Sequence, residues 1–121
     1  MTIEEFRRHK TKKSKYGNRA SEYGGAIYAS KKEALYAKHL DILRKAVSDT
    51  DRVIAWQAQV PYEIWVRHKF ICKYLLDFKV YYADGRIECI DIKGGNATKT
   101  PIYRLKKKLV EAIHCIVIKE I

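Results

Sequence analysis

The chain has 121 residues, 47% of them hydrophobic, and this length and composition fit one compact domain with a single core. Its 25 Lys and Arg residues outnumber 14 Asp and Glu residues and give a formal charge of +11, which predicts a polyanionic partner. Nucleic acid is favoured over a membrane, because the chain has no long apolar span and no basic amphipathic helix of the membrane type.

The cysteines and the amino-terminal segment predict a cytoplasmic protein. Cys72, Cys89 and Cys115 are odd in number and show no C-x-x-C spacing. All three lie in apolar, strand-like runs, so we expect buried and reduced thiols. The amino-terminal segment is charged and lacks the apolar stretch of a signal peptide.

Residues 1–25 are polar and basic, without alternation or a helical stripe, and predict a flexible arm ahead of a single domain over residues 26–121. We expect this arm to bind DNA phosphates through closely spaced cations. These cations include Lys10, Lys12, Lys13, Lys15 and Arg19. The alternative is a solvated tail.

A helix is predicted from Ser30 to about Val47. Ser30 and Glu33 form an S-x-x-E capping box at its start. Apolar residues then recur at three- and four-residue intervals, as on the buried side of a helix. They are Ala34, Leu35, Leu40, Leu43 and Val47.

Strands are predicted next. Val53–Gln57 and Val60–Val66 are rich in β-branched and aromatic residues and are interrupted near Pro61. A long hairpin follows, roughly Phe70–Tyr82 and Arg86–Lys93. Trp56, Tyr62 and Trp65 are candidates either for the core or for a subunit interface.

The turn of this hairpin sets the register of its two strands. Ala83-Asp84-Gly85 suits a three-residue loop with Gly85 at positive φ, which places Asp77 opposite Asp91. Asp77, Asp91 and Lys93 then share one face. The other face collects Leu76, Phe78, Val80, Ile90 and Ile92 as a core surface. A two-residue Asp84-Gly85 turn would mix polar and apolar side chains, so we prefer the three-residue loop.

After a loop over Gly94–Lys99, a second helix is predicted from Thr100, as N-cap, to about Ile113, with Pro101 in its first turn. Its expected buried stripe is Ile102, Leu105, Leu109 and Ile113. Lys106 lies at the edge of that stripe and could reach over the sheet to a phosphate, with Tyr103 beside it. The alternative for Lys106 is a lysine that covers apolar surface with its stem. Cys115–Ile118 is expected to form a closing strand.

This order of helix, strands, helix and strand, with D…D-x-K in the middle strands, resembles the PD-(D/E)XK nuclease superfamily. The local phrases SKKEA, QVPYE, LDFKV, DIKGG and PIYRLK are similar to small phage endonucleases that resolve Holliday junctions, over about residues 28–110. The resemblance implies an α/β fold with a restriction-endonuclease-like mixed sheet flanked by helices. Leu76 replaces the proline of the superfamily name, and Asp91 replaces the more frequent glutamate.

The resemblance also implies the site residues. Asp77 and Asp91 match the two acids, Lys93 matches the lysine, and Glu33 matches an acid that some subfamilies supply from the first helix. Mg²⁺, or Mn²⁺ in its place, would bind Asp77, Asp91 and the Ile92 carbonyl, with Glu33 direct or through water. Three roles stay open for Lys93: orienting the attacking water, accepting its proton, or neutralising charge in the transition state.

The expected function is a magnesium-dependent DNA endonuclease. The resemblance adds four-way DNA junctions as substrate, a phage setting and therefore the host cytoplasm, and a homodimer, because a resolvase cuts two strands symmetrically. Lys99, Tyr103 and Lys106 are expected to contact DNA together with the arm. The alternatives are a flap- or nick-generating nuclease of the same superfamily, and a non-catalytic nucleic-acid-binding module.

Overall fold

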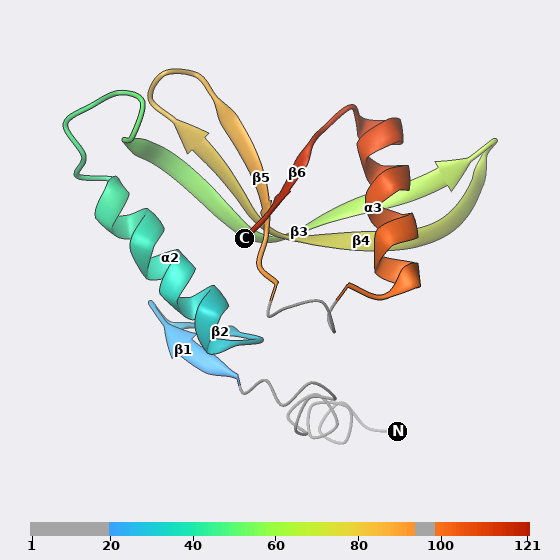
Figure 1. Cartoon of the computed structure of the whole chain (residues 1–121), viewed down its shortest axis with the longest axis horizontal. Coiled ribbons are helices and arrows are strands. Elements are labelled where there is room, and N and C mark those ends of the chain that lie inside the picture. The colour runs from blue at the N-terminus through green and yellow to red at the C-terminus, as the bar shows by residue number, and fades with distance from the viewer. Residues whose placement is uncertain (1–19, 94–98) are drawn as a thin grey trace. The chain divides into compact units, whose positions relative to one another are not determined.

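The computed structural model describes residues 20–93 and 99–121, which form a mixed α/β structure (Figure 1). Its elements are β1 (Ser21–Tyr23), β2 (Ala26–Tyr28), α2 (Lys31–Leu43), β3 (Val53–Val66), β4 (Lys69–Tyr82), β5 (Ile87–Asp91), α3 (Pro101–His114) and β6 (Ile118–Glu120). The predicted order of helix, strands, helix and strand is confirmed from α2 onwards. The chain divides into two compact units, one ending at Lys38 and one running from His39 to Ile121. Over the described ranges, no helix is long and apolar enough to span a membrane.

In the first unit, β1 and β2 form a short antiparallel hairpin that pairs Ser21 with Tyr28. Its turn consists of Gly24 and Gly25, both at positive φ, as a tight hairpin turn requires. Ser21–Tyr23 was expected to belong to the flexible arm and is instead a strand. The predicted phosphate-binding cations from Lys10 to Arg19 lie outside the described residues.

Helix α2 begins as predicted but ends earlier. The Glu33 amide donates a hydrogen bond of 3.1 Å to Ser30 Oγ, which confirms Ser30 as the N-cap. The helix stops at Leu43 rather than Val47, because bonds from residues 45 and 46 back to residues 42 and 43 tighten the last turn. Ala34 and Leu40 of the predicted stripe are buried, but Leu35 and Val47 are exposed.

The second unit contains a four-stranded sheet in the order β3-β4-β5-β6, antiparallel except for the parallel pair β5–β6. Strands β3 and β4 form a long hairpin whose turn is Arg67 and His68, both at positive φ. Strand β3 is continuous, and the predicted interruption is a local distortion at Gln59, which has a φ of 54°. Pro61 is tolerated because β3 is an edge strand.

The β4–β5 turn has the predicted three-residue loop. The Tyr82 amide donates to the Arg86 carbonyl at 2.9 Å, and Gly85 has a φ of 92°. The pairing of Phe78 with Ile90 then carries the register on to Asp77 opposite Asp91, as predicted. The predicted core face is buried along its whole length: Leu76, Phe78, Val80, Ile90 and Ile92.

The opposite face of β5 is buried as well, at Cys89, as expected for this thiol, and at Asp91. The reason is that β6 and α3 cover this end of the strand, and one apolar cluster joins all three elements. That cluster contains Ile64, Tyr74, Leu76, Cys89, Val110 and Ile118.

Helix α3 starts as predicted but turns a different side to the sheet. The Tyr103 amide donates to Thr100 Oγ1 at 3.2 Å, which confirms the N-cap, and Pro101 opens the first turn. The predicted buried stripe is wrong for Ile102, Leu105 and Ile113, which are 69%, 59% and 41% exposed, but Leu109 is half-buried and packs against the core. Val110 is fully buried instead, and the side of α3 that includes Tyr103 and Val110 packs on the sheet.

The last strand begins later than predicted, because Cys115 is an exposed C-cap of α3 in the left-handed conformation. Strand β6 starts only at Ile118. The prediction of three buried thiols is therefore wrong for Cys115, while Cys89 is buried and Cys72 half-buried. All three thiols are free.

The aromatic candidates for a subunit interface have different surroundings. Tyr62 is half-buried and packs against the core cluster. Trp56 is half-buried, donates to Asp41 at 2.9 Å and lies edge-on to Phe78. Trp65 is 47% exposed near the Arg67–His68 turn.

Candidate functional site: a carboxylate pair beside a basic pocket

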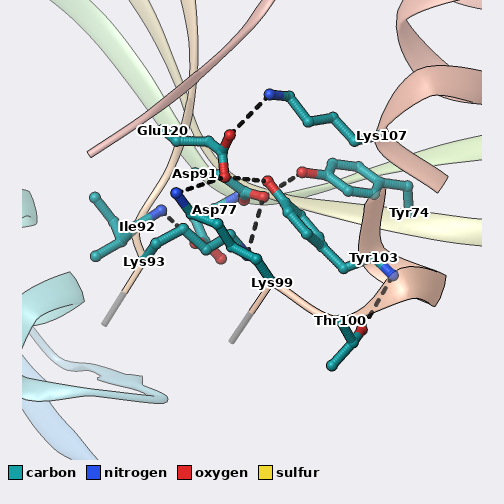
Figure 2. A network of polar contacts seen from close by, with 10 residues as sticks. All are labelled: Tyr74, Asp77, Asp91, Ile92, Lys93, Lys99, Thr100, Tyr103, Lys107 and Glu120. Carbon is teal, nitrogen blue, oxygen red and sulfur yellow. Dashed lines mark hydrogen bonds and ion pairs between the residues drawn. The ribbon is translucent and has the colours of Figure 1, made fainter. Parts of the chain in front are cut away.

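Two carboxylates bridge β4 and β5 at the point where their backbone ladder ends. The last paired residues are Phe78 and Ile90. Beyond them the Asp77 amide donates to Asp91 Oδ1 at 3.3 Å, and the Ile92 amide donates to Asp77 Oδ2 at 2.8 Å (Figure 2). Each carboxylate thus replaces a backbone acceptor on the neighbouring strand. This exchange fixes Asp77 and Asp91 side by side, as the sequence predicts.

Asp91 is almost completely buried, with 2% of its surface exposed. Leaving water would cost an isolated carboxylate several kcal/mol, so it requires partners. Besides the Asp77 amide, the Tyr74 hydroxyl donates to Asp91 Oδ2, and Lys93 Nζ lies 3.4 Å from the same oxygen. Lys93 is therefore at the predicted site and pairs directly with Asp91.

Two tyrosines close the site on the side of α3, and both remain protonated. Burial, followed by the hydrogen bond to Asp91, raises the pKa of Tyr74 well above its usual value. Burial and the nearby charges of Asp91 and Glu120 raise the pKa of Tyr103 in the same way. Lys93 Nζ lies 3.6 Å from the centroid of the Tyr103 ring, a cation–π contact. The sequence had no signal for Tyr74 beyond its place on the buried face of β4.

Glu120 of β6 is a further acidic residue that sequence reasoning missed. The parallel pairing of β5 and β6 sets Glu120 next to Asp91. Lys107 Nζ donates to Glu120 Oε1 at 2.9 Å, Lys99 Nζ lies 3.7 Å from Oε2, and the Tyr103 hydroxyl donates to Oε2 at 3.2 Å. The hydrogen bond from Lys107 is the main reason that the pKa of Glu120 is lowered. Glu120 could have been identified only from the parallel pairing of β5 with β6, the two strands that α3 connects.

The remaining predicted residues have different positions. Lys106 does not reach toward Asp77 and Asp91, since its Nζ lies 3.4 Å from the Lys73 carbonyl on β4. Its neighbour Lys107 is the lysine that enters the site, where it pairs with Glu120. Glu33 is described with the first unit, so its part in this site stays a prediction.

The oxygen donors of the pair fit a divalent cation. Mg²⁺ takes oxygen ligands, needs only one or two carboxylates and keeps several waters. Asp77 and Asp91 fit this requirement, and the Ile92 carbonyl is the nearest backbone donor in sequence. Among residues 20–93 and 99–121, no three His, Cys, Asp or Glu side chains gather as a metal-binding group. A cation here would therefore depend on two carboxylates and water, with Glu33 as the predicted third acid.

A family model described as "Protein of unknown function (DUF1064)" matches residues 13–118, and the chain belongs to this family. The match covers most of each unit and every residue of the site except Glu120. Comparisons with curated proteins and with solved structures found no match.

Proposed function

We propose that this DUF1064 protein is a magnesium-dependent DNA endonuclease that acts on four-way junctions as a homodimer. The observation that carries the proposal is the carboxylate pair, with Asp77 and Asp91 held side by side and Lys93 bound to Asp91. The restriction-endonuclease-like arrangement of the sheet and the preference for junctions come from the resemblance to the PD-(D/E)XK nucleases.

The chemistry of the pair suits phosphodiester hydrolysis. Mg²⁺ held by Asp77, Asp91 and the Ile92 carbonyl would polarise the phosphate and lower the pKa of bound water. Lys93 is held between the Asp91 carboxylate and the Tyr103 ring, so its ammonium group has a fixed position. From there it can stabilise negative charge that develops on the phosphate.

The formal charge of +11 gives the protein a general attraction for DNA. Electrostatic attraction alone cannot distinguish a junction from a linear duplex, because both carry the same phosphates. A shape-matched dimer can make that distinction, and it can place one site on each of two strands.

The test is cleavage of a four-way junction, a flap and a linear duplex of shared sequence by one preparation, with Mg²⁺, with Mn²⁺ and with chelator. We expect paired cuts in opposing arms of the junction and a dimer in sedimentation. Mixed dimers of active and Asp77→Asn subunits should nick one strand only. Cleavage of the flap or duplex at an equal rate, or a monomer at working concentration, would favour the general nuclease.

A second candidate is a nucleic-acid-binding module without catalysis. It is favoured by the full set of protein partners around Asp91, where a tyrosine, a lysine and a backbone amide already satisfy the carboxylate. Tight DNA binding with no cleavage of any of the three substrates, in Mg²⁺ or Mn²⁺, would establish this candidate.

A further inference from the structure

We propose that the pocket between α3 and β6 binds a phosphate of the DNA strand that passes the carboxylate pair, and that Glu120 binds the lysines of this pocket until DNA arrives. This inference deepens the proposed function and rests on it. It adds a second anion site, built by Lys99, Arg104, Lys107 and Lys108, to the expected contacts of Lys99 and Tyr103 with DNA.

The pocket has a volume of about 490 Å³, within the usual range of small-ligand sites, and it also includes Tyr103, Glu111 and Glu120. Arg104, Lys107, Lys108 and Glu111 are three, four and seven residues apart, so they share one side of α3. Lys99 enters from the segment just before the helix. The lining therefore has four cationic and two anionic side chains.

Both acids of the lining are already satisfied, but in different ways. Glu111 Oε2 accepts a hydrogen bond of 2.9 Å from the Ile118 amide, so Glu111 holds the start of β6, and it forms no ion pair with a lysine in the described part of the chain. Glu120 instead holds two lysines, Lys107 at 2.9 Å and Lys99 at 3.7 Å. Arg104 and Lys108 are exposed and form no ion pair with any residue that the structure describes. The pocket therefore contains two cationic side chains, Arg104 and Lys108, that can bind an anion without first leaving a described acidic partner.

The pocket adjoins the carboxylate pair through Tyr103. The ring of Tyr103 contacts Lys93 at the pair, and its hydroxyl donates to Glu120 in the pocket (Figure 2). Asp91 and Glu120 are neighbours in the β5–β6 ladder. A strand whose scissile phosphate lies at Asp77 and Asp91 would bring another phosphate of the same strand toward this pocket.

The chemistry of the lining selects a phosphate. Lysine and arginine side chains bind phosphate oxygens through charge-assisted hydrogen bonds. A phosphate that enters would compete with the Glu120 carboxylate for Lys107 and Lys99. Glu120 therefore weakens phosphate binding while it keeps the two lysines in place. Removal of its charge should then tighten DNA binding, which would not be expected if Glu120 had a purely structural role.

The first arm of the experiment measures affinity for a short duplex by fluorescence anisotropy over a range of salt concentrations, with chelator and no divalent cation. Lys107→Gln should weaken binding several-fold and reduce the salt slope by about 1. Lys119→Gln is the matched control, because Lys119 neighbours Glu120 in β6, points to the other face of the strand and carries the same charge. Equal effects of the two substitutions would overturn the proposal. If Lys107→Gln fails to fold, exposed Lys108→Gln takes its place under the same criteria.

The second arm compares Glu120→Gln with Glu111→Gln, which remove one negative charge each from the same pocket. Only the first releases lysines, so it should tighten duplex binding several-fold more than the second. Equal tightening, or weaker binding by Glu120→Gln, would contradict the role of Glu120. Tight binding of inorganic phosphate in calorimetry would identify a free-phosphate site and overturn the assignment to a DNA strand.

These readouts are separate from cleavage. If both arms behave as expected but no DNA is cut with Mg²⁺ or Mn²⁺, the pocket stands and the nuclease proposal fails. If DNA is cut but Lys107→Gln, or Lys108→Gln in its place, binds like Lys119→Gln, the nuclease stands and the pocket fails.

Discussion

The Tyr74 hydroxyl donates a hydrogen bond to Asp91 Oδ2 at a place where both side chains are buried. A buried carboxylate needs hydrogen-bond donors in place of the water that it has lost. Tyr74 supplies one of the donors that Asp91 requires inside the protein.

Tyr74→Phe should lower the free energy of unfolding by about 1–3 kcal/mol, because Asp91 stays buried and is deprived of a donor. The measurement is chemical denaturation near neutral pH. Tyr81→Phe is the matched control, since the Tyr81 hydroxyl donates a long, exposed hydrogen bond of 3.4 Å to Gln57. That control should stay within about 0.5 kcal/mol of the wild type. Equal destabilisation in the two variants would show that the Tyr74–Asp91 hydrogen bond makes no particular contribution to the free energy of unfolding.

Asp77→Asn should abolish DNA cleavage and leave DNA binding intact or tighter. The substitution removes one of the two carboxylates that would hold the cation, and it also removes repulsion toward phosphate. Asp51→Asn, an exposed change of equal charge, controls for the net charge of the protein. Cleavage and binding are measured on the same junction DNA. Full activity of Asp77→Asn in Mg²⁺ would exclude Asp77 from the site.

Glu120 should contribute stability that depends on pH. Because its folded pKa is lowered, its contribution is complete above the ordinary glutamate pKa of about 4.3 and is lost as the pH falls through the folded value. Its partly exposed ion pair limits the effect to less than about 1 kcal/mol. Glu120→Gln should flatten the decrease of unfolding free energy below about pH 4.3. Lys107→Met should remove the larger part of the same pH dependence, because Lys99 and Tyr103 also lower this pKa. The double variant should remove no more than Glu120→Gln alone.

The orientation of α3 can be tested by two truncations on the same helix. Val110→Ala should cost about 2 kcal/mol of unfolding free energy, because Val110 is fully buried in the core cluster. Leu105→Ala should change it by no more than about 0.5 kcal/mol, since Leu105 is 59% exposed. Thermal or chemical unfolding of both variants measures the difference. A larger loss of unfolding free energy in Leu105→Ala than in Val110→Ala would favour the buried stripe that the sequence predicts.

Neutralising the amino-terminal arm should weaken DNA binding and flatten its salt dependence, because fewer counterions are released. The variant replaces Lys10, Lys12, Lys13, Lys15 and Arg19 by Gln and keeps the length of the chain. The salt slope should fall by about 1 for each phosphate that the arm no longer neutralises. Cleavage at saturating protein should survive, since no proposed ligand lies in the arm. An unchanged slope would identify the arm as a solvated tail.

Local chemistry made part of this structure predictable. The register of Asp77 and Asp91 follows from a nearby turn, where Gly85 supplies the positive φ and only one loop length separates polar from apolar faces. The N-caps Ser30 and Thr100 are equally local, because each side chain bonds an amide three residues ahead.

Interactions between distant segments were not predictable. The apolar stripe of α3 suggested one buried side, but the side that packs on the sheet carries Val110, Tyr103 and Lys107. Tyr103 and Lys107 contact Lys93 and Glu120, which come from other parts of the chain. The position of Glu120 beside Asp91 depends on a parallel pairing that no turn specifies. Periodicity records which side chains are apolar and carries no information on such distant partners.

The pairing of β5 with β6 also has a kinetic consequence. The β3–β4 hairpin joins residues that are close in sequence, so its loop-closure entropy is small and we expect it to form early. The Lys93 and Ile121 amides, which donate to the Ile121 and Asp91 carbonyls, are protected only after α3 has brought β6 back to β5. In a hydrogen-exchange measurement, the free energy of opening should therefore be lower for these two amides than for the amides in the middle of the hairpin. The candidate site would then assemble last and open first, while the hairpin beneath it stays folded.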